Sequence, residues 1–139
     1  MILVGNTAQQ EARRPIAFAL DTTKLELQWE EYLDGGTKDA VVNGLRGNGA
    51  AFRLYGDLFD GKSREAYFST LDKSGTAGTI HAYGAASTDS LQSLSLAPNG
   101  GILLAGSSAS FGATEDLWVL RVASDGNMSF NDTSTEYGT

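Results

Sequence analysis

The chain has 139 residues, no cysteine and a net charge of −7, because its 17 acidic residues outnumber its 10 basic ones. The absence of cysteine excludes disulfides, thiolate metal sites and cysteine nucleophiles, and the acidic balance argues against nucleic acid or an anionic membrane surface as a partner. No run of about 18 apolar residues occurs, so the sequence predicts no membrane span. Residues 1–5 lack the charged start and long apolar core of a signal peptide, so any export signal is expected outside this sequence.

Three segments of the chain share one order of features, at a spacing of about 50 residues. Each begins with an apolar pair followed by glycine: Leu3-Val4-Gly5, Leu54-Tyr55-Gly56 and Leu104-Ala105-Gly106. Each continues with an apolar stretch that starts at Ile16, Tyr67 or Trp118. A repeat of this length with four strands in each unit is typical of a β-propeller blade.

The predicted strands follow in chain order. The first unit begins in a strand at the N-terminus and continues with strands at residues 16–20 and 25–33. The second unit has strands at residues 40–46, 51–57, 66–71 and 78–83, and the third has strands at residues 91–96, 102–107, 117–122 and 128–137. These eleven strands predict an all-β fold, a partial β-propeller of about 2.75 four-stranded antiparallel blades. The chain is expected to be one repeat domain whose units span residues 1–37, 38–87 and 88–139.

Turn residues separate the predicted strands. Asn48-Gly49 and Asn99-Gly100 each lie between apolar runs, and this dipeptide favours the type I′ turn of a β-hairpin. Asp72-Lys73-Ser74-Gly75 and Ser124-Asp125-Gly126-Asn127 are further hairpin signals. Residues 24–33 contain several helix formers, but their alignment with residues 76–84 favours a strand.

The third unit carries a distinctive order of motifs: Asn99-Gly100-Gly101-Ile102, Gly106, Ser110-Phe111-Gly112, Asp116-Leu117-Trp118 and Asp125-Gly126. This order resembles the bacterial β-propeller repeats of secreted and cell-surface proteins, which read Asp-Gly-Gly-x-Ile, Gly, Ser-Phe-Gly, Asp-x-Trp and Asp-x-x-Gly. The resemblance implies a secreted or cell-surface protein whose repeat serves as a scaffold or binding module and carries no catalytic residues. Propellers of this family close with more blades than this chain contains.

The ends of such a stack need a partner. A propeller removes exposed sheet faces by closing into a ring, and fewer than three blades cannot close. Open end faces of several hundred Å² would forfeit on the order of 10 kcal/mol. Three arrangements would cover them: further blades from a longer chain, a ring of identical copies, or docking on a different subunit.

Asp39 and Asp89 are the candidates for a metal site. They lie 50 residues apart, and each precedes a predicted inner strand. In a ring, equivalent carboxylates would face the channel mouth together and would suit a hard cation such as Ca²⁺. The favoured alternative is that each side chain caps its own turn by accepting hydrogen bonds from backbone N–H groups. No Asp-x-Asp-x-Asp-Gly loop occurs, so no cofactor is expected beyond this pair.

The predicted interaction loops connect the second and third strands of a unit, at residues 57–64 and 106–115. The candidate contact residues there are Asp57, Asp60, Arg64, Ser110, Phe111 and Glu115. His81, the only histidine, is predicted to face solvent on an outer strand rather than to act as a base. Trp29 and Trp118 are predicted to pack within the sheets, although exposed aromatic rings can also stack on sugars.

Three functions remain open. The repeat favours a non-catalytic scaffold or binding module whose partner is a protein or a glycan. A self-assembling structural protein is the first alternative, with the open ends as the interface between copies. The second is the propeller part of a polysaccharide-active enzyme, which needs two facing carboxylates, and Asp39 with Asp89 is the candidate pair.

Overall fold

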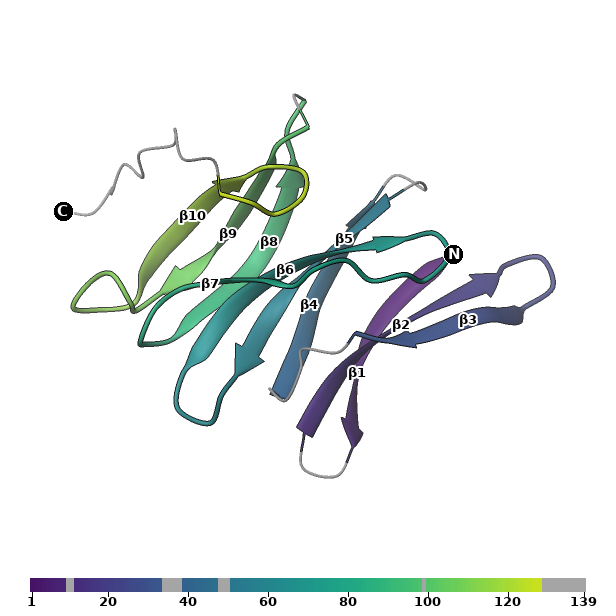
Figure 1. Cartoon of the computed structure of the whole chain (residues 1–139), viewed down its shortest axis with the longest axis horizontal. Helices are drawn as coiled ribbons and strands as arrows, with labels where there is room; N and C mark the ends of the chain where they lie inside the picture. The colour runs from purple at the N-terminus through teal and green to yellow at the C-terminus, as the bar shows by residue number, and fades with distance from the viewer. Residues whose placement is uncertain (10–11, 34–38, 48–50, 99, 129–139) are drawn as a thin grey trace.

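The computed structural model describes residues 1–9, 12–33, 39–47, 51–98 and 100–128 (Figure 1). These residues form ten β-strands and no helix, which confirms the all-β prediction. The strands make three antiparallel sheets that lie side by side in chain order (Figure 1). Strand β4 packs against β1 and β2 of the preceding sheet, and β8 packs in the same way against β5 and β6.

Each sheet is a meander in which every strand pairs with the one before it in the chain. The first sheet contains β1 (Ile2–Gln9), β2 (Ala12–Asp21) and β3 (Glu26–Tyr32). The second contains β4 (Asp39–Gly47), β5 (Ala51–Phe59), β6 (Arg64–Asp72) and β7 (His81–Tyr83). The third contains β8 (Asp89–Leu96), β9 (Ile102–Ser108) and β10 (Asp116–Val122).

The described strands lie where the sequence predicts strands, including β3, whose helix-forming residues are extended. Strand β7 is shorter than predicted, and before His81 its pairing with β6 continues only as an isolated bridge between Leu71 and Ala77. The predicted strand at residues 128–137 lies outside the described residues, apart from Met128, which forms an isolated bridge with Val122. The predicted turn at Asn48-Gly49 also lies outside them.

The hairpin between β6 and β7 closes on Asp72, as its sequence predicts. Its Oδ1 accepts hydrogen bonds from the N–H groups of Ser74 at 2.8 Å and Thr76 at 2.9 Å. Gly75 follows with a φ of +95°, a conformation that glycine adopts at no steric cost. The Ser74 hydroxyl and these N–H groups hold the pKa of Asp72 below its usual value.

The corresponding turns of the other sheets use the same chemistry. After β10, Asp125 accepts the N–H of Asn127 at 3.0 Å, and Gly126 has a φ of +92°. In the first sheet, Asp21 accepts the N–H groups of two turn residues, but the left-handed position is occupied by Leu25, with a φ of +58°. A leucine is strained in this region because its Cβ crowds the following carbonyl group.

The repeat predicted from the sequence is visible in the cross-strand pairs. Gly5 lies opposite Ile16, Gly56 opposite Tyr67, and Gly106 opposite Trp118. The inner strands β4 and β8 each carry one extra residue beside this glycine, which is Asn43 in β4 and Gln92 in β8. The three sheets therefore share one register, with a β-bulge in each described inner strand.

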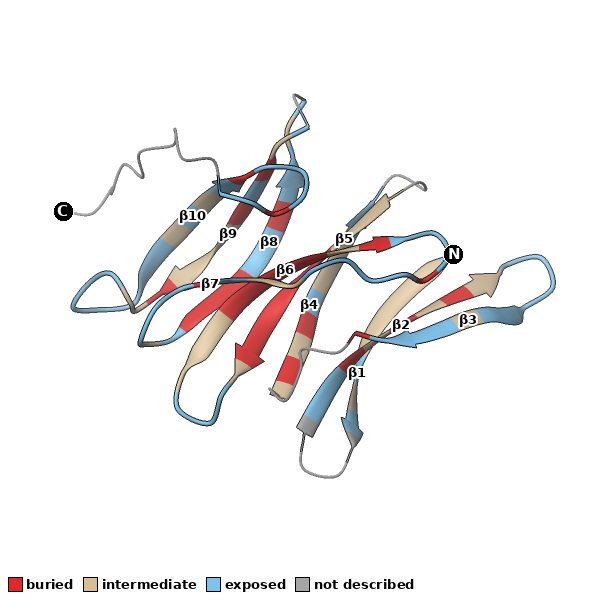
Figure 2. Ribbon diagram, viewed as in Figure 1, coloured by how far each residue is buried: buried red, intermediate tan, exposed pale blue. Residues whose placement is uncertain are grey.

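Buried residues lie on strands of all three sheets (Figure 2), and the apolar ones form the core between neighbouring sheets. The cluster between the first and second sheets contains the buried residues Ala17, Leu33, Val42, Leu54 and Leu71. The cluster between the second and third sheets contains Tyr55, Ala66, Phe68, Tyr83, Leu91, Leu94, Ile102, Leu104 and Val122. Leu54 and Tyr55, which are adjacent in β5, thus pack into different clusters, because successive side chains of a pleated strand point to opposite faces.

The outward face of the third sheet is apolar and exposed. Leu117 is 82% exposed and Val119 is 57% exposed. In the second sheet the residues at the same places of the repeat are Ala66 and Phe68, and the third sheet covers both of them completely. The third sheet therefore ends the described stack with the kind of surface that a further sheet covers elsewhere in the chain.

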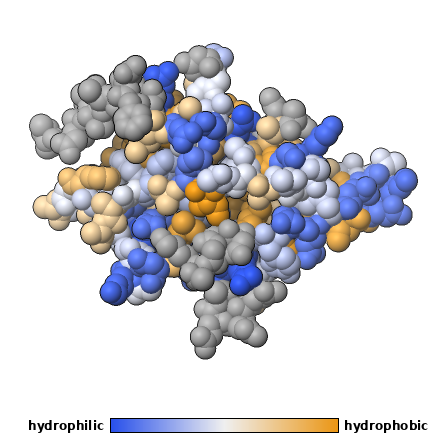
Figure 3. Space-filling view, viewed as in Figure 1, coloured by the Kyte–Doolittle hydropathy of each residue, from blue (hydrophilic) through white to orange (hydrophobic). Residues whose placement is uncertain are grey.

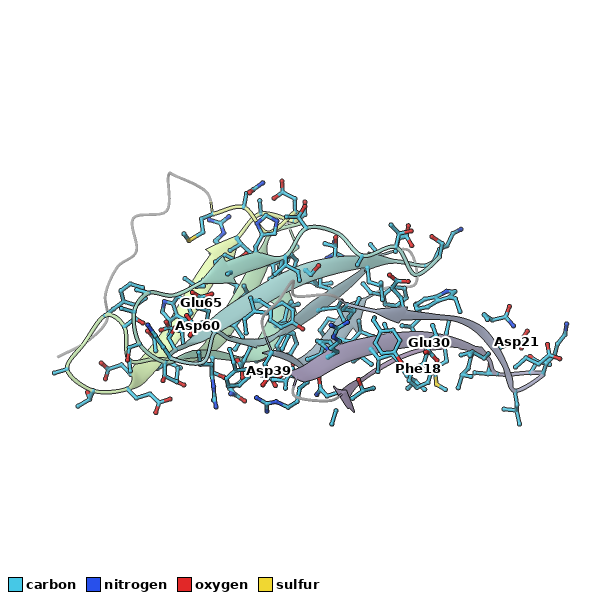
Figure 4. All side chains as sticks on the ribbon, turned by 60° about the horizontal axis from the view of Figure 1, so that its bottom comes forward. Phe18, Asp21, Glu30, Asp39, Asp60 and Glu65 are labelled. Carbon is cyan, nitrogen blue, oxygen red and sulfur yellow. The ribbon has the colours of Figure 1, made fainter. Side chains whose placement is uncertain are left out.

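The outward face of the first sheet carries Phe18. Its neighbour Ala17 faces the second sheet, so Phe18 faces away from it, beside its cross-strand partner Glu30 (Figure 4). Leu27 and Tyr32 of β3 are also exposed, at 54% and 37%. Both ends of the described stack thus present apolar side chains to solvent.

Candidate functional site

The loop between β9 and β10 presents an aromatic ring to solvent. Phe111 is 57% exposed, and its ring centroid lies 5.8 Å from that of Trp118. Apolar surface is visible where this loop lies, at the left end of Figure 3. Glu115 accepts a hydrogen bond from the Ser107 hydroxyl at 2.5 Å, which ties the end of the loop to β9. An exposed aromatic ring on a loop is suited to contact a sugar or a protein side chain.

Asp89, which is fully buried, holds this loop in place. Its Oδ2 accepts hydrogen bonds from the Ser110 hydroxyl at 2.6 Å and from the N–H of Ala85 at 3.0 Å, and its Oδ1 accepts one from the Ser108 hydroxyl. Gly84 has a φ of +130°, and a Cβ atom there would lie 2.2 Å from Asp89 Oδ2. The bond from Ala85 is the turn-capping role that the sequence favoured for this aspartate. Ser110, a predicted contact residue, uses its hydroxyl group to bond Asp89 in this network.

The loop between β5 and β6 is a closed turn on the same side of the stack (Figure 1). Asp60 is exposed, and its Oδ1 accepts the N–H groups of Lys62 at 2.8 Å and Ser63 at 2.7 Å. Asp60 and Glu65 lie at one end of the molecule, whereas Asp21 lies at the other end (Figure 4). The two hydrogen bonds that the Asp60 carboxylate accepts fix the shape of this loop.

Phe59, at the end of β5, lies between two guanidinium groups. The Cζ atoms of Arg13 and Arg64 lie 4.4 Å and 4.9 Å from its ring centroid. Arg13 also forms a salt bridge with Asp39, with 3.0 Å between Nη2 and Oδ2. This side-chain bond from Arg13 holds the pKa of Asp39 below its usual value. Arg64 and Asp39 thus belong to one cluster that joins the first and second sheets.

Asp39 and Asp89 do not occupy the same position of the repeat, and this prediction is wrong. The repeat glycine is Gly5, Gly56 or Gly106 in the three sheets. Asp89 lies opposite Ser108, which is two residues after Gly106. The corresponding pair of the second sheet is Ala40 and Leu58, so Asp39 is one residue out of step. Successive side chains of a strand face opposite sides, so the two carboxylates face different sides of their sheets. They are not the facing pair considered for a polysaccharide-active enzyme.

The described residues contain no group of three or more histidine, aspartate and glutamate side chains arranged to hold a metal ion. Asp39 is paired with Arg13, and both carboxylate oxygens of Asp89 accept hydrogen bonds from within the chain. A cation bound by either aspartate would have to displace these partners.

Asp57, a predicted contact residue, is only 5% exposed and joins two sheets instead. Its Oδ1 accepts the N–H of Leu91 at 3.3 Å, and its Oδ2 accepts the side-chain amide of Asn43 at 3.2 Å. The same amide donates to the Leu91 carbonyl oxygen at 2.8 Å. Between the first and second sheets, Asn6 alone bonds both the N–H and the carbonyl of Val42, at 2.7 Å and 3.1 Å.

Sequence reasoning missed this use of Asn6 and Asn43. The available signal was that Asn6 and Asp57 directly follow the repeat glycine, where Ser107 stands in the third unit. A polar residue at one place of a repeat indicates a recurring hydrogen-bonded contact.

The remaining candidates lie in contacts between sheets. His81 is half-buried, with its ring centroid 6.4 Å from that of Phe68, and does not face solvent as predicted. Trp29 donates a hydrogen bond from Nε1 to the Lys73 carbonyl oxygen at 3.0 Å, so it joins the first sheet to a turn of the second. Trp118 is half-buried beside the core, which confirms the packing role predicted for it.

No helix in the described part of the chain is long and apolar enough to cross a membrane. A scan against protein-family models finds no match to this chain, and a search of curated proteins finds no match either. The resemblance to bacterial β-propeller repeats therefore stays a prediction that rests on the motifs of the third unit.

Proposed function

We propose that the three sheets are consecutive blades of a β-propeller and that the chain is a non-catalytic binding module of a secreted or cell-surface protein. The observation that carries this proposal is the common register of the sheets, with the repeat glycine opposite Ile16, Tyr67 and Trp118. A stack of similar sheets is a rigid frame that presents its loops for recognition.

The loop between β9 and β10 is the proposed contact surface. Phe111 is exposed, while the residues just before it are anchored to buried Asp89, so the ring is offered from a fixed backbone. A preorganised aromatic side chain loses little conformational freedom on binding. Glu115 lies in the same loop, and the two side chains together suit a glycan or a protein partner.

Photo-crosslinking tests this surface. A photoreactive phenylalanine analogue is placed at position 111, and in a second variant at Leu25, which is 81% exposed at the opposite end of the strands. Binding through the loop predicts a crosslinked glycoconjugate or protein from position 111 only. An excess of unlabelled wild-type chain should abolish this crosslink, whereas the same excess of unlabelled Phe111→Ala should reduce it little. Equal crosslinking from both positions, or from neither, contradicts the proposal.

A second candidate function, self-assembly, is supported by the outward face of the third sheet. Leu117 and Val119 are exposed at the places where Ala66 and Phe68 are buried by the next sheet. A head-to-tail contact with the first sheet of another copy would cover this face, with β1 and β2 in the place of the inner strands that make the two contacts within the chain.

The mass in solution tests this second candidate. Sedimentation equilibrium of the wild-type chain and of Leu117→Glu compares association under the same conditions. Self-assembly predicts a mass above 14.7 kDa for the wild type and a monomer for the variant. A wild-type monomer across the micromolar range contradicts it, whatever the variant does.

A further inference from the structure

The repeat glycine has a clear purpose in the second and third sheets. A Cβ atom built at Gly56 would lie 1.9 Å from the carbonyl oxygen of Val41, and one at Gly106 would lie 1.8 Å from that of Ser90. Both carbonyls belong to the bulged inner strand that pairs with the glycine strand. Glycine is therefore needed wherever a bulged inner strand is present, because any side chain would collide with its backbone.

Gly5 has the same place in the first sheet, opposite Ile16, but lacks this neighbour. A Cβ atom at Gly5 would meet nothing closer than Ile16 Cγ2, at 4.0 Å. Within the described residues β1 pairs only with β2, so its other edge carries no strand. A glycine inside a strand costs roughly 0.5–1 kcal/mol relative to alanine, and no described contact of Gly5 requires that cost.

We infer that the free edge of β1 is a docking site for an extended segment of a partner polypeptide, which pairs antiparallel with β1 and carries a one-residue bulge opposite Gly5. This is addition of a strand to an open sheet edge, in which backbone hydrogen bonds supply affinity and alternate side chains supply specificity. The inference rests on the register of the repeat and is independent of the loop proposed as the contact surface.

The inner strands define the chemistry of the partner segment. Val42-Asn43-Gly44-Leu45 and Leu91-Gln92-Ser93-Leu94 both read apolar residue, bulge residue, small residue and leucine. The bulge residue of the partner need not be an amide, because Asn6 already bonds both main-chain groups of Val42 without help. We therefore expect a segment with an apolar residue opposite Gly5, any residue at the bulge, and a small residue followed by leucine.

A peptide with the sequence of residues 89–96, Asp-Ser-Leu-Gln-Ser-Leu-Ser-Leu, is the probe. It is added to the full chain, and hydrogen–deuterium exchange of residues 2–8 is compared with and without it. At a peptide concentration about ten times its Kd, the exchange of the outward-facing amides of β1 should slow about tenfold. A control peptide without the bulge residue Gln92 should protect β1 much less, because its register cannot match both sides of Gly5.

The Gly5→Ala variant separates this site from a general effect on folding. Its methyl group is expected to abolish the protection by the peptide while leaving the thermal unfolding midpoint unchanged or slightly higher. Phe111→Ala should keep the protection, because the loop is not involved. Unchanged exchange of β1 at millimolar peptide, or full protection in Gly5→Ala, would overturn the inference.

Discussion

Asp57 accepts a hydrogen bond from the main-chain N–H of Leu91, so a side chain of the second sheet holds the inner strand of the third. Asn43 completes the contact by donating to the Leu91 carbonyl oxygen at 2.8 Å. The preceding interface obtains both bonds from the single amide of Asn6. An aspartate plus an asparagine thus does in one interface what one asparagine does in the other.

This relationship predicts different outcomes for two replacements of Asp57. Asp57→Ala leaves the buried Leu91 N–H without its acceptor and removes one bond from the exposed Asn43 amide, so the free energy of unfolding should fall by about 1–3 kcal/mol. Asp57→Asn should cost less than half as much, because an asparagine meets the equivalent demand at position 6. Urea unfolding of both variants measures the difference, and equal losses would contradict the predicted role.

The repeat glycines should respond unequally to alanine. Gly56→Ala and Gly106→Ala force a methyl group against a backbone carbonyl, and each should destabilise the chain by about 1–3 kcal/mol. Gly5→Ala should be neutral or stabilising by up to about 1 kcal/mol, because the space beside it is open. Denaturant midpoints of the three variants provide the comparison. A large loss in Gly5→Ala would mean that the described chain itself requires this glycine.

Leu25 stores strain in the turn between β2 and β3. Its φ of +58° is unfavourable for leucine, and its side chain is 81% exposed, so little packing is lost on its removal. Leu25→Gly should therefore raise the free energy of unfolding by about 0.5–1 kcal/mol. Leu27→Gly, the same replacement inside β3, should lower it. Thermal unfolding of both variants decides, and a loss in Leu25→Gly would refute the strain.

The contact between Asp39 and Arg13 predicts a dependence of stability on acid. The pKa of Asp39 is lowered in the folded chain, so its contribution is fully present above the unfolded value near 3.9 and is lost as pH falls through the folded value. Asp39→Asn should cost about 0.5–1 kcal/mol at pH 7, as expected of an exposed ion pair. The free energy of unfolding of Asp39→Asn should also fall less than that of the wild type between pH 5 and pH 2.5. Parallel curves for the two proteins would contradict this assignment.

Two buried tyrosines should behave in opposite ways when their hydroxyl groups are removed. The Tyr83 hydroxyl donates to the Gly126 carbonyl oxygen, so Tyr83→Phe should destabilise the chain by about 1–2 kcal/mol. The Tyr67 hydroxyl is buried and has no hydrogen-bond partner among the described residues, and burial raises its pKa far above the usual value. Tyr67→Phe should therefore be neutral or stabilising by about 1 kcal/mol. A clear loss in Tyr67→Phe would reveal a partner, such as a buried water.

The sequence was informative about the strands because their signals are local. Alternating apolar residues placed β6 and β10, and the Asp-to-Gly turns placed the hairpins that follow them. The offsets of 50 residues from Gly56 to Gly106 and of 51 from Tyr67 to Trp118 predicted a repeat, and the structure pairs the glycine with the aromatic residue in both units. Short-range spacing was therefore enough for the fold class and most strand positions.

The positions of the aspartates could not be read in the same way. Asp39 and Asp89 were matched by a spacing of 50, but the strand residues around them repeat at 49, as Val42 and Leu91 show. A slip of one residue reverses the face of the sheet on which a side chain lies. Spacing along the chain cannot detect such a slip, because it depends on the lengths of the connections before each inner strand.

The loop residues were foreseen only in part. Phe111 and Glu115 are exposed on the predicted loop, whereas Asp57 and Ser110 are bonded within the fold. Both acidic and hydroxyl side chains are common on loops, so composition alone did not distinguish them. Their roles depend on which strand of the next sheet reaches them, which is a long-range property.

The residue directly after the repeat glycine makes different hydrogen bonds in the three units, so the order of the units matters. Asn6 satisfies a neighbouring strand alone, Asp57 needs the help of Asn43, and Ser107 donates to Glu115. A gene rearranged to exchange the second and third units would therefore place a serine beside an inner strand whose main-chain groups are bonded by a carboxylate or an amide in the natural order. Such a shuffled protein would retain every strand and still lose the fit between its parts, so the units are similar in shape but not interchangeable.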